Sequence, residues 1–286
     1  MNDRRHPVPP GLHLVSTPIG NARDITLRAL DVLAGADMIA AEDTRTARKL
    51  MEIHGVPLNG RRIIALHDHS SEAAVARLVE EIGTGRSLAY VSEAGTPLVA
   101  DPGFELARAA AAAGLDVLAT PGASAVLAAL AVAGLPTDRF AFVGFLPSGR
   151  EQRRAELAEL RDLPFTLVFY ESPKRVQEML GDLRDILGER RESAVCRELT
   201  KRFEEVRRGT LAELAESMDD KPRGEFVVLV GREGAQAVEE IDVETALRDA
   251  METMRVKDAA TAVAGALGLP RRQVYQIALG MKVDGQ

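Results

Sequence analysis

The stretch VSEAGTPLVADPG, residues 91–103, lies between an apolar run that ends at Val91 and a helix-like segment that begins at Phe104. It combines glycine and proline with small residues, and its charged side chains are the carboxylates Glu93 and Asp101. Loops that bind phosphate usually present glycine amides beside a cationic side chain. This stretch therefore predicts a loop at the end of a strand whose ligand is not held through phosphates.

Outward from this loop, short apolar runs alternate with amphipathic segments such as DITLRALDVLAGA and SEAAVARLVEEIGTG. The alternation predicts a mostly parallel sheet with helices on both faces, which makes the first part of the chain an α/β domain. We expect its strands at residues 12–15, 38–41, 63–66, 88–91 and 117–119.

The pattern changes after Pro136, and the segment ELTKRFEEVRRG, residues 198–209, predicts a β-hairpin. Turn-rich segments at TPGAS and after Gly231 divide the chain into an N-terminal α/β domain (1–120), a second α/β domain (121–231) and a helical tail (232–286). We expect the tail to be helical throughout residues 243–282. The expected strands of the second domain are residues 140–143, 165–170, 194–197, 204–208 and 226–230.

Composition narrows the class of protein. The chain has 286 residues, 46% hydrophobic and 28% charged, which is typical of a soluble globular protein. Its single cysteine, Cys196, fits a reducing compartment. The first ten residues lack the apolar core of a secretory signal, and the most apolar region, residues 123–135, is shorter than the roughly 20 residues of a membrane span. We therefore expect a cytoplasmic protein without membrane contact.

The expected first sheet gathers polar loops at one edge, because the carboxyl ends of parallel strands lie together. Such loops follow each strand candidate and are rich in residues that turn the chain or cap helices. Turns and caps alone would explain any single loop, but the whole set predicts an active-site rim. The loops are residues 17–21, 42–45, 67–70, 92–103 and 120–124.

The sequence lacks the motifs of several common binding and catalytic sites. No GxGxxG follows the first strand, and neither a P-loop motif nor a GxSxG elbow occurs. His67 and His69 are two residues apart, but we find no further ligands to complete a metal site, and we expect none. A polar organic cofactor without phosphates remains as the expected ligand.

Eight ordered motifs together carry a resemblance to a known family. They are LVSTPIGNARDIT, AEDTRTARKL, SEAGTPLVADPG, TPGASAVLAALAVAGLP, FVGFLP, FYESPKR, CRELTKRFEE and GEFVVLVG. This set closely resembles the bacterial small-subunit ribosomal RNA 2′-O-ribose methyltransferases, which modify a cytidine of the decoding centre and belong to the tetrapyrrole methylase superfamily. The resemblance covers about residues 12–231, and the helical tail fits the C-terminal extension of the same family.

The resemblance implies a two-lobed α/β fold with a small helical extension, S-adenosylmethionine in the cleft between the lobes, and a homodimer. S-adenosylmethionine carries no phosphate, in agreement with the loop at residues 91–103. Glu93 departs from the family, which often has aspartate there. The positions that the resemblance assigns to cofactor binding are Pro18, Ser92, Glu93, Ala94, Gly95, Thr96, Pro97, Ser124, Ala125, Phe145 and Leu146.

Methyl transfer to a ribose hydroxyl requires alignment with the sulfonium methyl and gains from a proton acceptor. Four side chains at the expected cleft edge are catalytic candidates, namely Asp43, His67, Glu171 and Glu198. Glu171 follows the apolar strand FTLVFY, and two roles fit it: proton acceptor, or cap of a helix that begins near Pro173.

Local clusters of positive charge offset the formal net charge of −7, which by itself disfavours a nucleic-acid partner. The hairpin charges fit either phosphate binding or a solvated surface paired with Glu204 and Glu205. The tail fits either a helix-turn-helix that contacts RNA or a dimer interface. The candidate RNA-binding residues are Arg45, Arg197, Lys201, Arg202, Arg271 and Arg272.

The sequence thus predicts an S-adenosylmethionine-dependent enzyme that methylates the ribose of a decoding-centre cytidine in 16S ribosomal RNA, with the small ribosomal subunit as partner. A methyltransferase of tetrapyrroles or precorrins is the alternative with the same fold and cofactor. A non-catalytic ribosome-assembly factor is the alternative from another class.

Overall fold

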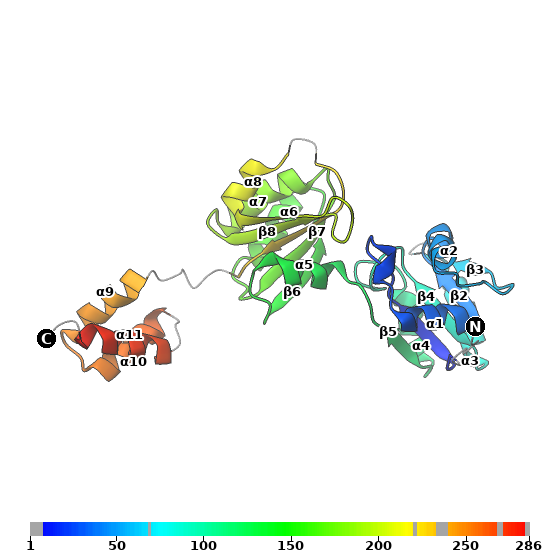
Figure 1. Cartoon of the computed structure of the whole chain (residues 1–286), viewed down its shortest axis with the longest axis horizontal. Helices are drawn as coiled ribbons and strands as arrows, with labels where there is room; N and C mark the ends of the chain where they lie inside the picture. The colour runs from blue at the N-terminus through cyan, green and yellow to red at the C-terminus, as the bar shows by residue number, and fades with distance from the viewer. Residues whose placement is uncertain (1–7, 68–69, 220–221, 233–239, 268–270, 284–286) are drawn as a thin grey trace.

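The computed structural model describes residues 8–67, 70–219, 222–232, 240–267 and 271–283. It contains two α/β lobes and a group of C-terminal helices (Figure 1). The first lobe holds strands β1–β5, the second lobe extends from α5 to β10, and the C-terminal helices are α9–α11. The two-lobed α/β fold with a helical extension confirms the expected fold class.

The first lobe is built on a sheet of parallel strands in the order β3-β2-β4-β1-β5. The central strands β2 and β4 are buried along their whole length, which explains why they appear in the sequence as continuous apolar runs. The strands at the two edges, β3 and β5, are more exposed. The bounds of the strands are β1 Gly11–Val15, β2 Met38–Ala41, β3 Ile63–Ala65, β4 Ser87–Val91 and β5 Val117–Thr120.

Helices connect these strands, and several begin at side-chain caps that the sequence indicates. Thr26 caps α1, Asp43 caps α2 and Ser71 caps α3 by accepting hydrogen bonds from backbone N–H groups of the first turn. All the strands point the same way, so the loops that follow them meet at one edge of the sheet, as expected. The helices are α1 Leu27–Gly35, α2 Thr44–Ile53, α3 Glu72–Gly83 and α4 Phe104–Ala112, with a 3-10 turn at Ala22–Asp24.

The second lobe has a mixed sheet in the order β6-β7-β10-β8-β9. β6 and β7 are parallel, whereas β10 is antiparallel to both β7 and β8. β8 and β9 form the expected antiparallel hairpin. Its strands are β6 Phe140–Phe145, β7 Thr166–Glu171, β8 Glu192–Arg197, β9 Glu205–Thr210 and β10 Phe226–Val230.

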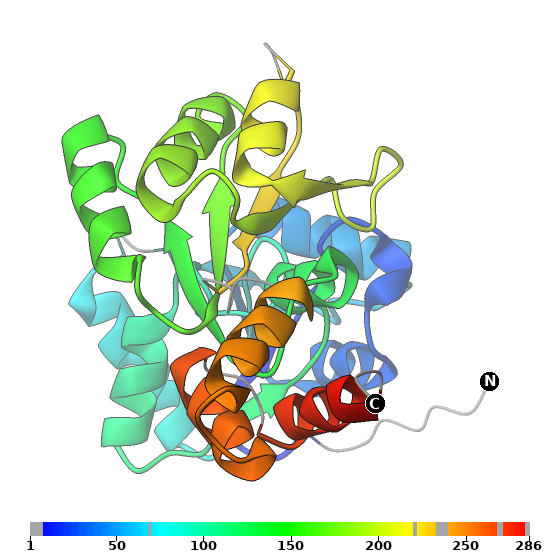
Figure 2. The ribbon, with the colours of Figure 1, turned by 90° about the vertical axis from the view of Figure 1, so that its left-hand side faces the viewer.

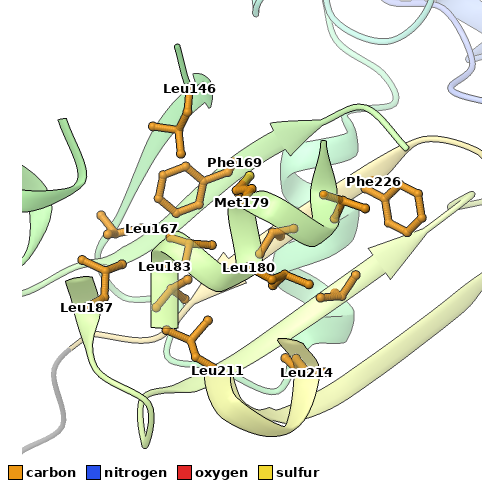
Figure 3. Close-up of a cluster of buried hydrophobic side chains, with 14 of the residues drawn as sticks. Leu146, Leu167, Phe169, Met179, Leu180, Leu183, Leu187, Leu211, Leu214 and Phe226 are labelled. Atoms are coloured by element: carbon orange, nitrogen blue, oxygen red, sulfur yellow. The ribbon is translucent and has the colours of Figure 1, made fainter. Parts of the chain in front are cut away.

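Helices cover both faces of this second sheet. On one face Leu167 and Phe169 pack with α7 and α8 (Figure 3), and Leu157 of α6 belongs to the same cluster. On the other face Val168 packs against the apolar helix α5, which is the helix expected at residues 123–135. The alternation along β7 therefore buries both sides of the strand. The helices are α5 Ala125–Ala133, α6 Arg150–Leu160, α7 Val176–Leu187 and α8 Leu211–Ser217.

The C-terminal helices are α9 Glu240–Met251, α10 Val256–Leu267 and α11 Arg271–Val283. They share their own apolar cluster, in which Val243 and Leu247 pack with Val263 and Val274. They lie on the far side of the second lobe from the first lobe (Figures 1 and 2). The expectation of helix throughout residues 243–282 was too simple, because α9 ends at Met251 and α10 begins at Val256.

Among the described residues, no helix is both long enough and apolar enough to cross a bilayer.

Candidate functional site

A cavity of about 740 Å³ lies between the two lobes. The first lobe lines it with the loops after β1, β4 and β5 and with one side of α2. The second lobe contributes Phe145, residues 170–173, and residues of the β8–β9 hairpin and β10. Three of the five expected rim loops, residues 17–21, 92–103 and 120–124, therefore contribute to one wall of this cleft, whereas the described residues of 42–45 and 67–70 are not in its lining.

Backbone hydrogen bonds join two loops at the floor of the cleft. The N–H of Thr17 donates to the carbonyl of Gly95 at 2.8 Å, and the N–H of Gly95 donates to the carbonyl of Thr17 at 3.0 Å. Gly95 has φ +81°, and a Cβ built there would lie 3.3 Å from the Ile19 side chain. Glycine is therefore favoured by the backbone conformation, and an added Cβ would be in tight contact with Ile19.

Hydroxyl groups connect a third loop to this floor. Thr96 Oγ1 donates to the carbonyl of Ala123 at 3.0 Å, and Ser16 Oγ donates to Thr96 Oγ1 at 3.3 Å. Gly122 packs against Ser16, where an added Cβ would lie 2.9 Å from the serine Cβ. The ends of β1, β4 and β5 are thus held together by bonds that involve few long side chains.

The loop after β4 contains unusual backbone conformations. Leu98 has φ 71° and Ala100 has φ 59°, a region that costs non-glycine residues on the order of 1–3 kcal/mol each. Gly103 has φ +109°, and a Cβ there would lie 2.5 Å from the ring of Tyr90. Strained residues cluster at functional sites, so this loop is a candidate ligand clamp.

A buried carboxylate forms part of the opposite wall. Glu171 ends β7 and is 3% exposed, and its Oε1 accepts hydrogen bonds from the N–H and hydroxyl of Ser172 at 2.7 and 3.2 Å. Its Oε2 lies 3.1 Å from Arg175 Nη2, close enough for an ion pair but not aligned for a hydrogen bond. Arg175 also donates to the carbonyls of Leu146 and Pro147 at 2.6 and 3.0 Å. This arginine therefore connects the ends of β6 and β7.

Aromatic rings stand beside this carboxylate. Phe145 is 56% exposed and lies edge-on to Tyr170, with ring centroids 5.7 Å apart. Burial, together with the charge of Asp101, raises the pKa of the Tyr170 hydroxyl to about 12. The phenol is therefore protonated at neutral pH and does not act as a base.

The β8–β9 hairpin reaches across the cleft to the first lobe. Its Thr200 Oγ1 accepts a hydrogen bond from the N–H of Asn21 at 3.1 Å. Lys201 Nζ lies 2.9 Å from both Glu198 and Glu225. Burial opposes the charge on Lys201, but the two carboxylates outweigh it and raise its pKa. Lys201 is therefore a cation that is already paired.

The four catalytic candidates have different surroundings. Glu171 lines the cleft, whereas Asp43, His67 and Glu198 are not part of its lining. Hydrogen bonds from Arg45, first from its side chain and then from its backbone, lower the pKa of Asp43 to about 2, which makes it a poor proton acceptor.

The other two candidates serve local structure. The carboxylate of Glu198 holds Lys201 and also accepts from the backbone N–H of Glu225 at 3.0 Å. The N–H of His67 donates to Ser70 Oγ at 2.9 Å, and His69 lies outside the described residues. Glu171 is thus the candidate that the geometry favours.

Glu171 does not cap the following helix as one interpretation of the sequence had it. That helix, α7, begins at Val176 rather than near Pro173, and its N-cap residue is Arg175, without a side-chain cap hydrogen bond. The carboxylate instead binds the chain directly after it.

Most of the expected cofactor positions lie at the cleft. Ser92 and Leu146 are 4% and 2% exposed and lie beneath the surface, and Leu146 belongs to the core under α7. Pro97 is also not in the lining. The positions in the lining are Pro18, Glu93, Ala94, Gly95, Thr96, Ser124, Ala125 and Phe145.

The candidate RNA-binding residues are spread over three regions. Arg45 pairs with Asp43 on α2, while Arg197 donates to the carbonyl of Arg223 at 2.7 Å and lies 3.5 Å from Glu205. Arg202 stacks over the ring of the exposed Phe203 at 5.5 Å. Arg271 and Arg272 are exposed at the start of α11.

Sequence reasoning missed Thr17 and Lys49, which both line the cleft. Thr17 follows β1 in an expected rim loop, but its backbone pairing with Gly95 joins residues far apart in the chain and leaves no local signal. Lys49 belongs to the quoted motif AEDTRTARKL, and its helical spacing from Thr46 and Ile53 was the available signal.

Within the described part of the chain, no group of three or more histidine, cysteine, aspartate or glutamate residues is placed to hold a metal ion.

Comparison with known proteins identifies the family. The family model described as "Tetrapyrrole (Corrin/Porphyrin) Methylases" matches residues 11–215. The chain belongs to the tetrapyrrole methylase family. A second model, "RsmI C-terminal HTH domain", matches residues 237–282, the region of the C-terminal helices.

Among curated members of the family, "Ribosomal RNA small subunit methyltransferase I" of Mesorhizobium japonicum is 45% identical over 278 residues, covering 96% of this chain and 94% of the relative. The protein of the same name from Xylella fastidiosa (strain Temecula1) is 43% identical, covering 93% of this chain and 98% of the relative. Similarity at this level extends over both lobes and the tail.

Solved structures share the tetrapyrrole methylase fold. A diphthine synthase has a TM-score of 0.60 at 18% identity, covering 77% of this chain and 89% of that chain. A uroporphyrin-III C-methyl transferase of Thermus thermophilus, complexed with S-adenyl homocysteine, has a TM-score of 0.53 at 21% identity, covering 77% of this chain and 96% of that chain. These structures support the fold alone.

Proposed function

We propose that this protein methylates the ribose 2′-hydroxyl of a cytidine in the decoding centre of 16S ribosomal RNA. It is an S-adenosylmethionine-dependent ribosomal RNA methyltransferase, as its relatives' names and its family indicate. The observation that carries the proposal is the whole-chain similarity to small-subunit methyltransferases combined with a cleft that suits this cofactor.

The residues of the cleft fit S-adenosylmethionine. Its sulfonium and ammonium groups are cationic, and the lining includes the carboxylates Glu93, Asp101, Glu171 and Glu225. The loop held by Gly95 and Thr17 offers a small-residue surface on which an adenosine and a methionyl chain can lie. When bound, the cofactor supplies an activated methyl group.

Glu171 would accept the proton of the ribose hydroxyl or orient that hydroxyl. Its Oε2 is buried beside the cleft and accepts no hydrogen bond among the described residues, so it retains the capacity to accept one from a hydroxyl that displaces the residues covering it. Its ion pair with Arg175 holds the carboxylate in place. Alignment of the hydroxyl by the cleft walls would supply a further part of the rate.

RNA would reach the cleft along positively charged segments. We assign Lys201, Arg197 and Arg202 of the hairpin, together with Arg45, to RNA contact at the cleft mouth. Arg271 and Arg272 open α11, where the helix dipole disfavours cations by about 0.3–1 kcal/mol, and a bound phosphate would remove this conflict.

The remaining assignments follow the same proposal. Residues 1–120, 121–231 and 232–286 would be the domains, and the separate apolar cluster of α9–α11 supports the last boundary. The enzyme would act in the cytoplasm as a homodimer. Exposed Leu27, Phe104 and Leu127 on first- and second-lobe helices offer apolar surface for such an interface. Light scattering tests the dimer.

Labelled methyl transfer tests the main proposal. Purified protein and S-adenosylmethionine are incubated with small ribosomal subunits from a strain that lacks the enzyme, and methylated nucleotides are mapped by mass spectrometry. We expect one 2′-O-methylcytidine in the decoding centre. Methyl transfer to a tetrapyrrole but not to RNA would favour a tetrapyrrole or precorrin methyltransferase. RNA binding without methyl transfer would indicate a ribosome-assembly factor.

A further inference from the structure

One side of α2 faces the cleft. Thr46, Lys49, Leu50 and Ile53 all line the cavity, and their spacing of three, four and seven residues places them on one face of a helix. The opposite face is fixed in the lobe by Ala47 and Met51, which are 7% and 2% exposed. The orientation of α2 is therefore set by its packing, and the cleft-facing strip is a fixed surface.

The charge of Lys49 is not neutralised. Among the described residues, no carboxylate pairs with Lys49, although it is exposed at the cleft. The other lysine of the lining, Lys201, is held by Glu198 and Glu225. On the same helix, Arg45 is held by Asp43. Lys49 thus presents a full positive charge to whatever enters the cleft beside α2.

The chemistry of this strip selects an anionic ligand with apolar parts. A cation without a partner attracts an anion, and Ile53, which is 56% exposed, and Leu50 add apolar surface within one turn of it. Under the proposed function, the cofactor is cationic at its sulfonium and ammonium groups, and its single carboxylate is its one anionic group. RNA is the reactant that carries a phosphodiester at every nucleotide, next to ribose and base surfaces.

We propose that the cleft-facing strip of α2 binds the RNA next to the nucleotide that is methylated, with Lys49 contacting a phosphodiester and Leu50 and Ile53 contacting the neighbouring sugar or base. This assignment rests on the proposed function and deepens it. It places a substrate-binding wall on the first lobe, opposite the hairpin that carries Lys201.

Lys49→Gln tests the assignment against Arg48→Gln. Each variant removes one positive charge from the exposed surface of α2, but only Lys49 lines the cleft. Binding of small-subunit RNA is measured by filter retention between 0.05 and 0.3 M salt, about the range in which phosphate contacts are resolved. Cofactor affinity is measured by calorimetry, and methyl transfer gives KM and kcat.

We expect Lys49→Gln to lower the slope of log affinity against log salt by about 0.7, which corresponds to roughly fivefold weaker binding at 0.1 M salt. KM for RNA should rise by a similar factor while kcat stays unchanged, because ground-state binding is lost. Arg48→Gln should change binding less than twofold, about the effect of a distant charge under screening. Lys49→Arg should retain wild-type binding, since arginine also contacts phosphate.

Two results would overturn the inference. Equal effects of Lys49→Gln and Arg48→Gln would show only a general contribution of charge, and a loss of cofactor affinity in Lys49→Gln would assign Lys49 to the carboxylate of the cofactor. In both cases wild-type protein still methylates the RNA, so the proposed function stands. Failure of wild-type protein to methylate or bind the RNA would instead reject the proposed function, and this inference with it.

Discussion

The two lobes bury polar side chains of different kinds. In the first lobe the buried polar residues are one histidine and a set of hydroxyls, such as Ser16, Thr17 and Ser92. In the second lobe four charged side chains are also buried, namely Arg153, Glu171, Asp182 and Arg191. Both lobes contribute walls to the same cleft, so the difference concerns how each wall is held.

At the cleft, the loops of the first lobe are joined mainly through the backbone, whereas an arginine joins two segments of the second lobe. Thr17 and Gly95 pair by main-chain hydrogen bonds, which short side chains then support. In the second lobe Arg175 binds two carbonyls of the loop after β6. Arg191 donates to the carbonyl of Gly231 at 2.6 Å, at the end of β10 that is away from the cleft. The parallel strands of the first lobe end side by side at one edge, where main-chain bonds can reach, whereas the buried carboxylate at the end of β7 takes Arg175 as its partner.

Asp182→Asn should give the largest loss of stability. Asp182 is 2% exposed and lies 2.8 Å from Arg153, which is 1% exposed, so the variant leaves a buried arginine whose remaining carboxylate partner is the exposed Glu178, 3.5 Å away. We expect a loss of about 3–5 kcal/mol in the free energy of unfolding, measured by urea denaturation. A loss below about 1 kcal/mol would show that the buried charges do not brace the second lobe as the comparison requires.

The effect of Asp182 should depend on pH. Burial alone would raise the pKa of Asp182, but hydrogen bonds from Arg154, Arg153 and Arg150 outweigh it and hold the pKa below its usual value. The carboxylate therefore stabilises the fold above its unfolded pKa of about 3.9, and this contribution is lost as pH falls through the lower folded pKa. The difference between wild type and Asp182→Asn should be constant at pH 5–7, about one unit or more above that pKa, and should shrink below about pH 4.

Glu171→Gln should lower turnover by about 100-fold, the lower range for loss of a general base. The amide keeps the size of the side chain and can still accept from Ser172, so cofactor affinity should change less than about twofold. Single-turnover methyl transfer and calorimetry separate the two effects. Ser172→Ala is the matched control, because it removes a hydroxyl bound to the same carboxylate without removing the carboxylate. Wild-type turnover in Glu171→Gln would show that the carboxylate has no catalytic role and serves only as the ion-pair partner of Arg175.

Gly95→Val should weaken cofactor binding by roughly 5- to 150-fold, which corresponds to about 1–3 kcal/mol of backbone strain. Gly85 is the matched control, since it lies before the same strand β4 that Gly95 follows and has φ +89° with nothing within 4 Å of an added Cβ. Gly85→Val should lower the melting temperature without changing cofactor affinity. Similar cofactor affinities in the two variants would remove the special role of the Thr17–Gly95 pairing.

Thr96→Val should give the smallest effect, about 1–2 kcal/mol in the free energy of unfolding, because each hydroxyl hydrogen bond contributes about 0.5–1.5 kcal/mol. The variant keeps the shape of the side chain but removes the bond to the carbonyl of Ala123 and the bond that Thr96 accepts from Ser16. Thermal unfolding measures the change. A loss of stability as large as that of Asp182→Asn would contradict the view that many weak hydrogen bonds together hold the loops of the first lobe.

Much of the fold was predictable from the sequence. Buried parallel strands read as continuous apolar runs, and β2 and β4 were placed within one residue of their observed ends because a few buried residues suffice to define them. The hairpin β8–β9 was expected from its turn-rich, charged connection and is present. Ends of helices were less well placed, as α7 shows, because they depend on caps and packing as well as on the residues themselves.

The site was predictable only where it follows from the order of the strands. The rim loops were expected at one edge because parallel strands end there. Asp43 and Glu198 were catalytic candidates, but in the structure Asp43 caps α2 and Glu198 binds Lys201. In the sequence, a loop carboxylate that takes part in catalysis cannot be distinguished from one that caps a helix or pairs with a cation. Its partners, such as Arg45 or Lys201, become known only when the chain is folded.

The sequence by itself determined the family, the alternation of strands and helices, and the loops that meet at the cleft, because these depend on motifs and on spacing along the chain. Only the tertiary structure decided that Thr17 pairs with Gly95, that Glu171 is buried against Arg175, and that Lys49 faces the cleft. The physical reason is that hydrogen bonds, ion pairs and burial depend on distances between residues that are far apart in the chain. The local sequence contains no information on those distances.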